Sequence, residues 1–311
     1  MKIGFIFSGQ GAQYHGMGKD LYEKFPTVRK HFDLAEEIMQ EPLKNIMFSE
    51  DERLHLTLYA QPSIFTLSTA IRDLLSNYNI VSSASAGLSL GEYSAYYDAG
   101  VFDFESGLRT IIHRAYFMHK NTESHPGAMV ALLGDKTNLQ RLIEDIDGCY
   151  IANLNSPTQT VVGGQKESME KVVSDFKNYG FRRATILKTS GAFHTPLMET
   201  ARKEFYDYIK YTQKEPPNKP LYLNTTGKKY TDEDLNDVMS TQMVSPVKFE
   251  AMIESMMNDG IEVFIEVGPQ DTLKRLIKKQ ARDCHVYHIE NIETLEATLQ
   301  ALKELNNEIL K

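Results

Sequence analysis

The sequence lacks tryptophan, has only two cysteines and carries fewer basic than acidic side chains. Its 34 Lys and Arg residues against 42 Asp and Glu residues give a formal net charge of −8. This balance argues against general affinity for DNA or RNA, because such binding needs a cationic surface. No apolar run approaches the roughly 20 residues that a membrane-spanning helix needs. The expected partners are therefore small molecules and proteins, with no nucleic acid and no membrane.

Cys149 and Cys284 are too few for a disulfide framework and show no CxxC spacing. The apolar start at residues 1–7 is too short for a signal peptide and runs directly into a Gly/Gln turn. These observations predict a reducing, cytoplasmic location. The spacing of the histidines is not that of a metal site, so no metal is expected. A monomer is the default expectation.

A hydrophobic content of 41% supports a sizeable core, and the chain reads as alternating strands and helices. Apolar segments predict strands at residues 2–7, 80–86 and 262–267. Helices are predicted to open at Gln61-Pro62, to cover about 104–119 behind the cap Asp103, and to form a polar surface helix over about 291–311. This alternation predicts an α/β body.

The middle of the chain has a different pattern. Strands are predicted at 127–134, 149–153, 159–163 and 182–188, and helices at 136–146 and 165–179. The order β-α-β-β-α-β within about 60 residues is typical of a ferredoxin-like unit. We therefore expect a ferredoxin-like subdomain over residues 124–189, inserted into a larger catalytic body formed by residues 1–123 and 190–311.

Gly87-x-Ser89-x-Gly91 matches the nucleophile-elbow pattern between a predicted strand and a predicted helix. In such a turn the serine hydroxyl projects from a strained backbone, and flanking glycines let strand and helix approach closely. The alternative is a Gly-rich helix entry in which Ser89 is an ordinary cap. Glu92 lies in the first turn of the helix, where the helix dipole explains an acidic residue better than a triad role does.

A serine nucleophile needs a base within hydrogen-bonding reach, and His194 is the candidate. It precedes Thr195 and Pro196, a possible N-cap and first residue of a helix. The positive end of the helix dipole would favour the neutral imidazole that a general base requires. The alternative is a histidine in a capping region without a catalytic part.

Arg114 lies beside the apolar stripe of the helix predicted at 104–119. A guanidinium against a buried stripe is costly unless it meets a carboxylate, which its planar donor fork matches in two bonds. A substrate carboxylate is one partner. A snorkelling arginine and an internal pair with Asp or Glu are the alternatives.

Seven segments, taken in order, resemble the malonyl-CoA:acyl carrier protein transacylases, including the acyltransferase domains of polyketide synthases. They are FSGQGAQ (7–13), GLSLGEYSA (87–95), the helix of Arg114, NSPTQTVVGG (155–164), GAFHTPLM (191–198), QMVSPVKF (242–249) and EVGP (266–269). They span nearly the whole chain. The resemblance implies an α/β-hydrolase-like body with a parallel sheet and an inserted ferredoxin-like subdomain.

The resemblance also assigns roles to single residues. It implies that Ser89 is the nucleophile, His194 the base and Arg114 the ligand of the malonyl carboxylate. The backbone N–H groups of Gln10 and Leu90 would form the oxyanion hole, and the backbone carbonyl of Gln242 would orient the histidine in place of the acid of a triad. Leu88, Met118, Phe193 and Asn155 would line the substrate site, together with Asn153.

Two positions depart from the family. Leu88 stands where the family has histidine, which removes a polar group beside the acyl pocket, and is similar to some stand-alone acyltransferases of polyketide assembly lines. Ser8 stands where proline is common. Phe193, in Ala-Phe-His, resembles the malonyl-selective motif and would leave no room for an α-methyl branch.

The implied activity is ping-pong transfer of malonyl from malonyl-CoA to the phosphopantetheine thiol of acyl carrier protein, in fatty acid or polyketide biosynthesis, without a cofactor. There are three alternatives. A stand-alone acyltransferase of polyketide synthesis and a hydrolase that edits acyl carrier proteins would use the same Ser/His pair. A non-enzymatic scaffold would form no covalent adduct. The basic cluster Lys274, Arg275, Lys278, Lys279 and Arg282, on a helix predicted after Gly268-Pro269, is the expected docking site; the alternative is a solvated helix face.

Overall fold

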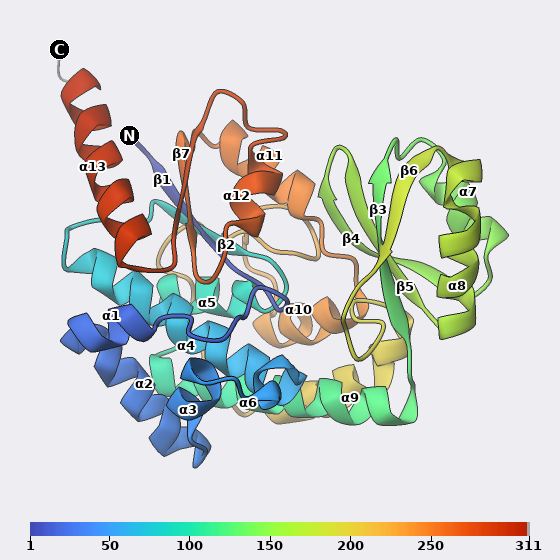
Figure 1. Cartoon of the computed structure of the whole chain (residues 1–311), viewed down its shortest axis with the longest axis horizontal. Helices are drawn as coiled ribbons and strands as arrows, with labels where there is room; N and C mark the ends of the chain where they lie inside the picture. The colour runs from blue at the N-terminus through green and yellow to red at the C-terminus, as the bar shows by residue number, and fades with distance from the viewer. Residues whose placement is uncertain (310–311) are drawn as a thin grey trace.

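The computed structural model describes residues 1–309, and its strands form two separate sheets (Figure 1). The first sheet has the order β2-β1-β7-β8 and all neighbouring strands are parallel. Its strands are β1 (Ile3–Phe7), β2 (Ala84–Gly87), β7 (Val263–Val267) and β8 (His285–Ile289). The strands predicted at 2–7 and 262–267 are confirmed, whereas the one predicted at 80–86 is short and begins only at Ala84.

Helices cover both faces of this parallel sheet, and a parallel sheet needs that because it is buried on both sides. Before the inserted region they are α1 (Lys19–Lys24), α2 (Pro26–Met39), α3 (Leu43–Phe48), α4 (Thr57–Ser76), α5 (Gly91–Asp98) and α6 (Phe104–Ser124). After it they are α9 (Glu199–Ile209), α10 (Leu235–Thr241), α11 (Phe249–Asn258), α12 (Thr272–Ile277) and α13 (Ile292–Ile309). No helix within residues 1–309 is both long and apolar enough to cross a membrane.

The second sheet has the order β4-β5-β3-β6 with antiparallel pairing throughout. Its elements are β3 (Ala128–Gly134), α7 (Leu139–Asp145), β4 (Cys149–Ser156), β5 (Gln159–Gly164), α8 (Lys166–Asp175) and β6 (Phe181–Ile186). This confirms the predicted β-α-β-β-α-β order, and the strand order is that of a ferredoxin-like unit. The expected subdomain limits, 124 and 189, lie at the last residue of α6 and three residues beyond β6.

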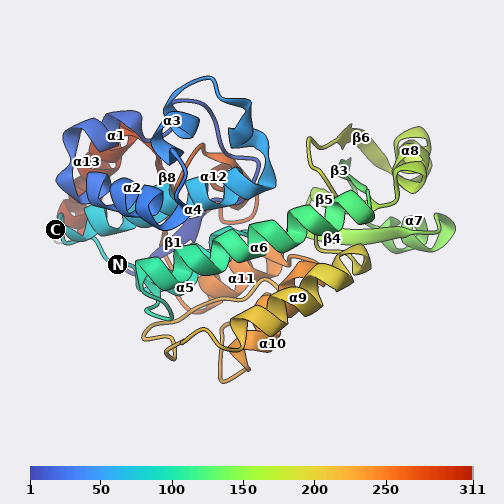
Figure 2. The same ribbon diagram turned by 90° about the horizontal axis from the view of Figure 1, so that it is seen from below.

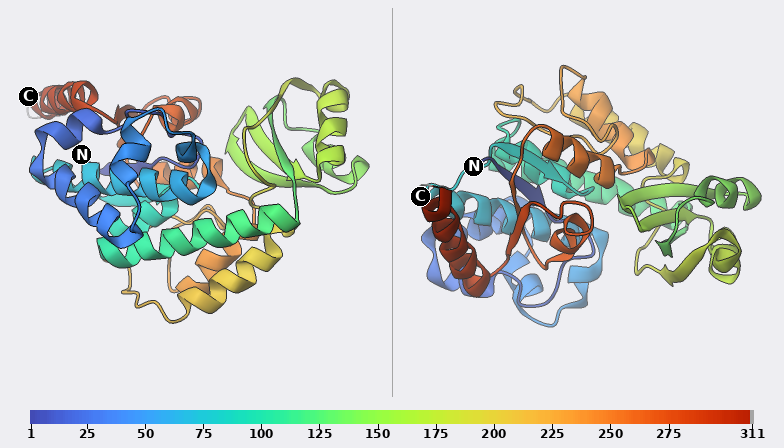
Figure 3. Two further views of the ribbon diagram at one scale, coloured as in Figure 1. Left: turned by 60° about the horizontal axis from the view of Figure 1, so that its bottom comes forward. Right: turned by 90° about the horizontal axis from the view of Figure 1, so that it is seen from above.

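The long helix α6 connects the two regions. Figure 2 shows it running from the parallel sheet toward the antiparallel one, with α9 alongside. The further views in Figure 3 show the antiparallel sheet with α7 and α8 at the far end of this helix. Asp103 caps α6 as predicted, because its Oδ1 accepts from the Ser106 N–H at 2.7 Å. One end of α6 is thereby fixed in the body, and Arg114 lies midway along the helix.

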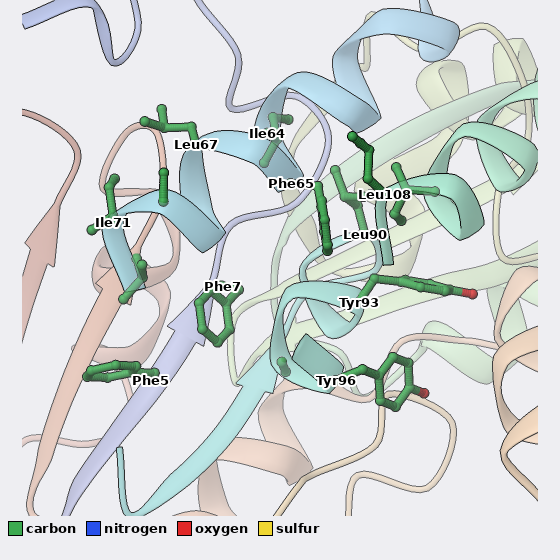
Figure 4. Close-up of a cluster of buried hydrophobic side chains, with 14 of the residues drawn as sticks. Phe5, Phe7, Ile64, Phe65, Leu67, Ile71, Leu90, Tyr93, Tyr96 and Leu108 are labelled. Atoms are coloured by element: carbon green, nitrogen blue, oxygen red, sulfur yellow. The ribbon is translucent and has the colours of Figure 1, made fainter. Parts of the chain in front are cut away.

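Alternation along β1 separates two apolar cores. Phe5 and Phe7 pack with α4, α5 and α6 on one face of the sheet (Figure 4), and Ile6 packs with α11 and α12 on the other. A third cluster lies between the antiparallel sheet and its two helices. These cores hold the carboxyl ends of β1, β2 and β7 together at one edge of the sheet, where the loop after β2 carries Ser89.

Three helix predictions are corrected. Helix α4 begins at Thr57, so Pro62 lies inside it and only the carbonyl of Leu58, one turn earlier, loses a hydrogen bond. The C-terminal helix is not simply polar, because it buries Leu295 and Leu302 against the core; residues 310–311 of the predicted segment lie outside the described residues. Helix α12 ends at Ile277, so the basic cluster continues beyond it into the following turn.

Candidate active site

Ser89 lies at a strained turn between β2 and α5. Its φ is 54°, in the left-handed region that most side chains avoid. A Cβ on Gly87 would lie 2.1 Å from the backbone carbonyl carbon and oxygen of Gly91, and one on Gly91 would lie 2.0 Å from the carbonyl oxygen of Phe7. Glycine is therefore required on both sides. No side chain caps α5, so the cap alternative for Ser89 is wrong.

His194 contacts this serine. Its Nε2 lies 2.7 Å from Ser89 Oγ, and its Nδ1 lies 2.8 Å from the backbone carbonyl oxygen of Gln242. A carbonyl can only accept, so Nδ1 carries the proton and Nε2 is free to accept the serine hydroxyl proton. This is the nucleophile–base geometry that the sequence predicted, with a backbone carbonyl in the place of a carboxylate.

The surroundings of His194 favour the neutral imidazole that a general base requires. Burial, and then the positive charge of Arg114, lower its pKa from 6.5 to about 4, against the raising effect of the Gln242 carbonyl. As predicted, Thr195 is the N-cap and Pro196 the first residue of a helical segment, which starts as the 3-10 turn Pro196–Met198 and continues directly into α9 (Glu199–Ile209). The causes of the pKa shift are desolvation and the nearby cation.

Arg114 is fully buried directly behind Ser89. Its Nη2 donates to Ser89 Oγ at 3.3 Å and to Gln242 Oε1 at 2.9 Å, and its Nη1 donates to Gln61 Oε1 at 2.7 Å. Its Nε has no partner, and its guanidinium lies 5.1 Å from the ring centre of Tyr93. This burial excludes a snorkelling arginine. Within residues 1–309 no carboxylate contacts Arg114 directly, and the charge of Glu92 acts on it from beyond the amide of Gln242.

Two further residues complete the site, and one prediction is corrected. Glu92 is fully buried; its carboxylate accepts from Gln242 Nε2, and from the backbone N–H of Asn224 at 2.8 Å. Asn224 Oδ1 in turn accepts from the Ser89 N–H at 2.7 Å. The helix dipole alone therefore does not explain Glu92. Asn224 belongs to no motif that the sequence predicted, and in the sequence it looks the same as a polar surface residue of an irregular segment.

The two backbone N–H groups predicted to form the oxyanion hole are free to bind a substrate oxygen. Neither the Gln10 N–H nor the Leu90 N–H donates to another group of the described chain. The Gln10 side chain is held at both ends, by Thr57 Oγ1 at 3.0 Å and by Gln61 Nε2 at 3.0 Å. Their role as an oxyanion hole stays a prediction. Gln61, expected only as the start of a helix, links this loop to Arg114.

A cavity of about 360 Å³ opens onto Ser89 and His194, between the parallel and antiparallel sheets. The predicted lining residues all border it: Leu88, Met118, Phe193, Asn155 and Asn153. Other bordering residues are Gln10, Gln159, Lys188, Thr272, Leu273 and Leu276. Arg114 itself does not border the cavity, but Ser89, which it contacts, does. The Oδ1 of Asn155 is buried without a partner.

The two departures from the family have local consequences. Leu88 is half-buried against the core on the α11 side of the sheet and presents an apolar surface to the cavity. Ser8 donates its hydroxyl to the buried carboxylate of Glu266 at 3.3 Å. Serine in place of proline therefore gains a hydrogen bond instead of leaving a gap.

Comparison with known proteins agrees with this geometry. The sequence matches the acyl transferase domain family over residues 4–303. It is 35% identical over 313 residues to a malonyl CoA-acyl carrier protein transacylase of Bacillus subtilis, covering 98% of this chain and 99% of that protein. A crystal structure of the transacylase from Clostridium perfringens superposes with a TM-score of 0.96 at 32% identity, with 100% of both chains covered.

A further similar structure includes a protein partner. It is a malonyl-transacylase in complex with its type II PKS acyl-carrier protein. The TM-score is 0.92 at 28% identity, over 97% of this chain and 100% of that chain.

The lowered pKa of His194 predicts its titration. With a pKa near 4, the ring stays neutral between pH 8 and 5, because protonation begins only as the pH falls toward 4. Nuclear magnetic resonance of histidine-labelled protein measures this directly, with His194→Ala to assign the signal. A His194 resonance that titrates with a midpoint near 6.5 would contradict the role of burial and of Arg114.

Proposed function

The chain belongs to the acyl transferase domain family of the malonyl-CoA:acyl carrier protein transacylases, and we propose that Ser89 carries malonyl from malonyl-CoA to the phosphopantetheine thiol of an acyl carrier protein. The observation that carries this proposal is Arg114, a fully buried cation 3.3 Å from the nucleophile whose guanidinium contacts no carboxylate directly. A buried guanidinium whose donors meet only neutral acceptors favours a substrate that brings a carboxylate to them. Malonyl places a carboxylate two bonds beyond the carbonyl that Ser89 attacks.

In the first half-reaction Ser89 Oγ attacks the thioester carbonyl while His194 Nε2 takes its proton. The N–H groups of Gln10 and Leu90 would stabilise the oxyanion, each contributing about 3 kcal/mol in comparable enzymes. The C–S bond then breaks, and the sulfur of CoA leaves with the proton held by His194. The product is a malonyl ester of Ser89.

In the second half-reaction the thiol of the carrier protein gives its proton to His194 and attacks the ester. The C–O bond to Ser89 breaks, and the serine oxygen regains the proton. One thioester is exchanged for another, so the balance requires no cofactor and no metal. Water must be kept from the ester, and the cavity walls of Met118, Phe193 and Leu88 supply apolar cover.

Arg114 serves recognition and orientation. Its contacts to Ser89, Gln61 and Gln242 are to neutral acceptors, which a carboxylate can displace or join. A malonyl group held at both ends presents its carbonyl to the thiol in one orientation. Phe193 on the cavity wall would oppose an α-methyl branch, which favours malonyl over a branched diacid.

Fatty acid and polyketide synthesis share this chemistry. The similar complex with a type II PKS carrier protein and the apolar Leu88 support stand-alone service to polyketide synthesis as the second candidate. A cytoplasmic site of action is part of the proposal and is supported by the free thiols of Cys149 and Cys284. An editing hydrolase is disfavoured, because simple acyl groups offer Arg114 no carboxylate.

The proposal is tested by whether the malonyl ester of Ser89 passes to carrier protein or is released as free malonate. Exposure to malonyl-CoA is expected to add one malonyl group to Ser89, and added carrier protein should remove it as malonyl carrier protein, faster than free malonate appears. Intact-mass measurement follows both species, with Ser89→Ala as the control. Release of malonate as the main product, without transfer, would establish a hydrolase instead.

Arg114→Ala tests the selectivity. Loss of the cation should lower acylation by malonyl-CoA by about 10-fold to 150-fold, since a charged hydrogen-bonded pair contributes about 1.5–3 kcal/mol. Acylation by acetyl-CoA, which carries no carboxylate, should change far less. Initial rates with the two donors give the comparison. Equal losses with both would mean that Arg114 only supports the structure.

We propose further that the carrier protein docks beside α12. Thr272, Leu273 and Leu276 of this helix border the cavity, so its outer side lies close to the entrance. Of the predicted basic cluster, Arg275 is paired with Asp271 and Lys274 contacts His288. The exposed Lys278, Lys279 and Arg282 form no ion pair among the described residues, and the first two directly follow α12. Carrier proteins of this type are expected to be acidic, so these two lysines are suited to bind them.

The double change Lys278→Glu/Lys279→Glu should raise KM for the carrier protein about tenfold and weaken its dependence on salt. Acylation by malonyl-CoA should stay within twofold. The control is Lys30→Glu/Lys303→Glu, which makes the same change of net charge at exposed lysines of α2 and α13. An unchanged KM, or the same rise in the control, would place the docking surface elsewhere.

A further inference from the structure

A buried carboxylate lies behind the residue that orients the base. We propose that Glu92 is a positioning residue, which fixes Gln242 and Asn224 so that Ser89, His194 and Arg114 face one another. Glu92 touches none of the reacting groups itself. The inference rests in part on the proposed function, because acylation by malonyl-CoA is one of the two reactions used to test it.

The first step concerns the amide of Gln242. Its Nε2 donates to Glu92 and, at 3.0 Å, to the carbonyl oxygen of Ser89, while its Oε1 accepts from Arg114 at 2.9 Å. Turned by 180°, the amide would point its NH₂ at the guanidinium and its oxygen at two other oxygens. A carboxylate can only accept, so Glu92, together with the Ser89 carbonyl, selects the orientation in which Gln242 binds Arg114.

The second step concerns the backbone of Gln242. Its carbonyl oxygen accepts from His194 Nδ1 at 2.8 Å, and the residue begins the short 3-10 turn Gln242–Val244. The side-chain bond to Glu92 ties this turn to α5, the helix that follows the nucleophile. Restraining the side chain therefore also restrains the carbonyl that orients the base.

The third step concerns the nucleophile. The second oxygen of Glu92 accepts from the Asn224 N–H at 2.8 Å. The Asn224 side chain spans the strained turn: Oδ1 accepts from the Ser89 N–H and Nδ2 donates to the Gly87 carbonyl, both at 2.7 Å. One carboxylate therefore fixes the residues that hold both members of the Ser–His pair.

The burial of Glu92 and of its partners strengthens its hold on Gln242 and Asn224. Glu92, Asn224 and Gln242 are all fully buried, so water cannot replace a lost bond. Burial raises the pKa of Glu92 to about 7, against the lowering effect of the bonds from Asn224 and Gln242. At pH 8 the group is mainly ionised and accepts on both oxygens, and that pH is therefore used for the experiment.

Glu92→Gln tests the inference with almost no change of shape. The new NH₂ group is a donor, and it must face one of two other donors. It faces either the Asn224 N–H, which then loses its acceptor, or the NH₂ of Gln242. In the second case the Gln242 amide has to turn over, which points its NH₂ at the guanidinium of Arg114. We expect acylation by malonyl-CoA to slow about 10-fold to 100-fold. Labelling by a fluorophosphonate, in which Ser89 Oγ bonds to phosphorus and fluoride leaves, should slow at least tenfold, because it needs the same serine and base.

The matched control is Asp98→Asn, the same change at a buried carboxylate at the other end of α5. Asp98 accepts from Ser82 and Ser85 and pairs with Arg72, away from Ser89. Its variant should label within twofold of the parent rate, whatever it loses in thermal stability. Thermal unfolding of each variant establishes that the fold is intact, and a purely structural role for Glu92 would lower stability without changing labelling by the folded protein.

Labelling of folded Glu92→Gln within twofold of the parent rate would overturn the inference. Gln242→Met is measured in parallel, since it keeps the backbone carbonyl and removes only the amide between Glu92 and Arg114. It should slow labelling to a similar extent, and unchanged labelling of this variant would overturn the inference even if Glu92→Gln does not fold. If the parent protein labels but does not accept malonyl, the proposed function fails while the positioning role stands.

Discussion

The site depends on a positive charge that is buried with no carboxylate in direct contact, since the charge of Glu92 acts on it only from beyond the amide of Gln242. The guanidinium of Arg114 donates only to neutral acceptors, on Ser89, Gln61 and Gln242. Such burial is costly, and desolvation lowers the pKa of Arg114 accordingly. The same charge helps to keep His194 neutral. One cation thus favours both an unprotonated base and a negatively charged substrate, two requirements that would otherwise need separate residues.

Both members of the Ser–His pair have left-handed backbones, with φ of 54° at Ser89 and 61° at His194. Such conformations persist only where the surroundings impose them. At Ser89 they do so through the close approach of Gly87 and Gly91 and through the side chain of Asn224. At His194 the backbone N–H donates to the Met243 carbonyl at 3.0 Å, beside the carbonyl that binds the ring. Strain that exposes the nucleophile is therefore offset by buried hydrogen bonds from distant segments.

The site residues that can be predicted from the sequence are those marked by their neighbours in the chain. Ser89 and His194 stand out because glycines, a capping threonine and a proline mark turns on either side, and Arg114 because it interrupts an apolar stripe. Glu92 was noticed but explained only by the helix dipole. Asn224 and Gln61 were missed, because a buried asparagine in an irregular segment and a glutamine inside a helix look the same as polar surface residues until their burial is known.

The α/β class, the ferredoxin-like order, the nucleophile turn and the resemblance that pairs Ser89 with His194 can all be predicted from the amino-acid sequence, because they depend on local periodicity and on short motifs. Which side chains meet across the chain is known only once the chain has folded. The bonds from Ser89 to Asn224 and from Glu92 to Gln242 join segments that are 135 and 150 residues apart. Burial, charge compensation and hydrogen-bond direction are properties of these long-range contacts, so the lowered pKa of His194 and the neutral hydrogen-bond partners of Arg114 follow from the fold.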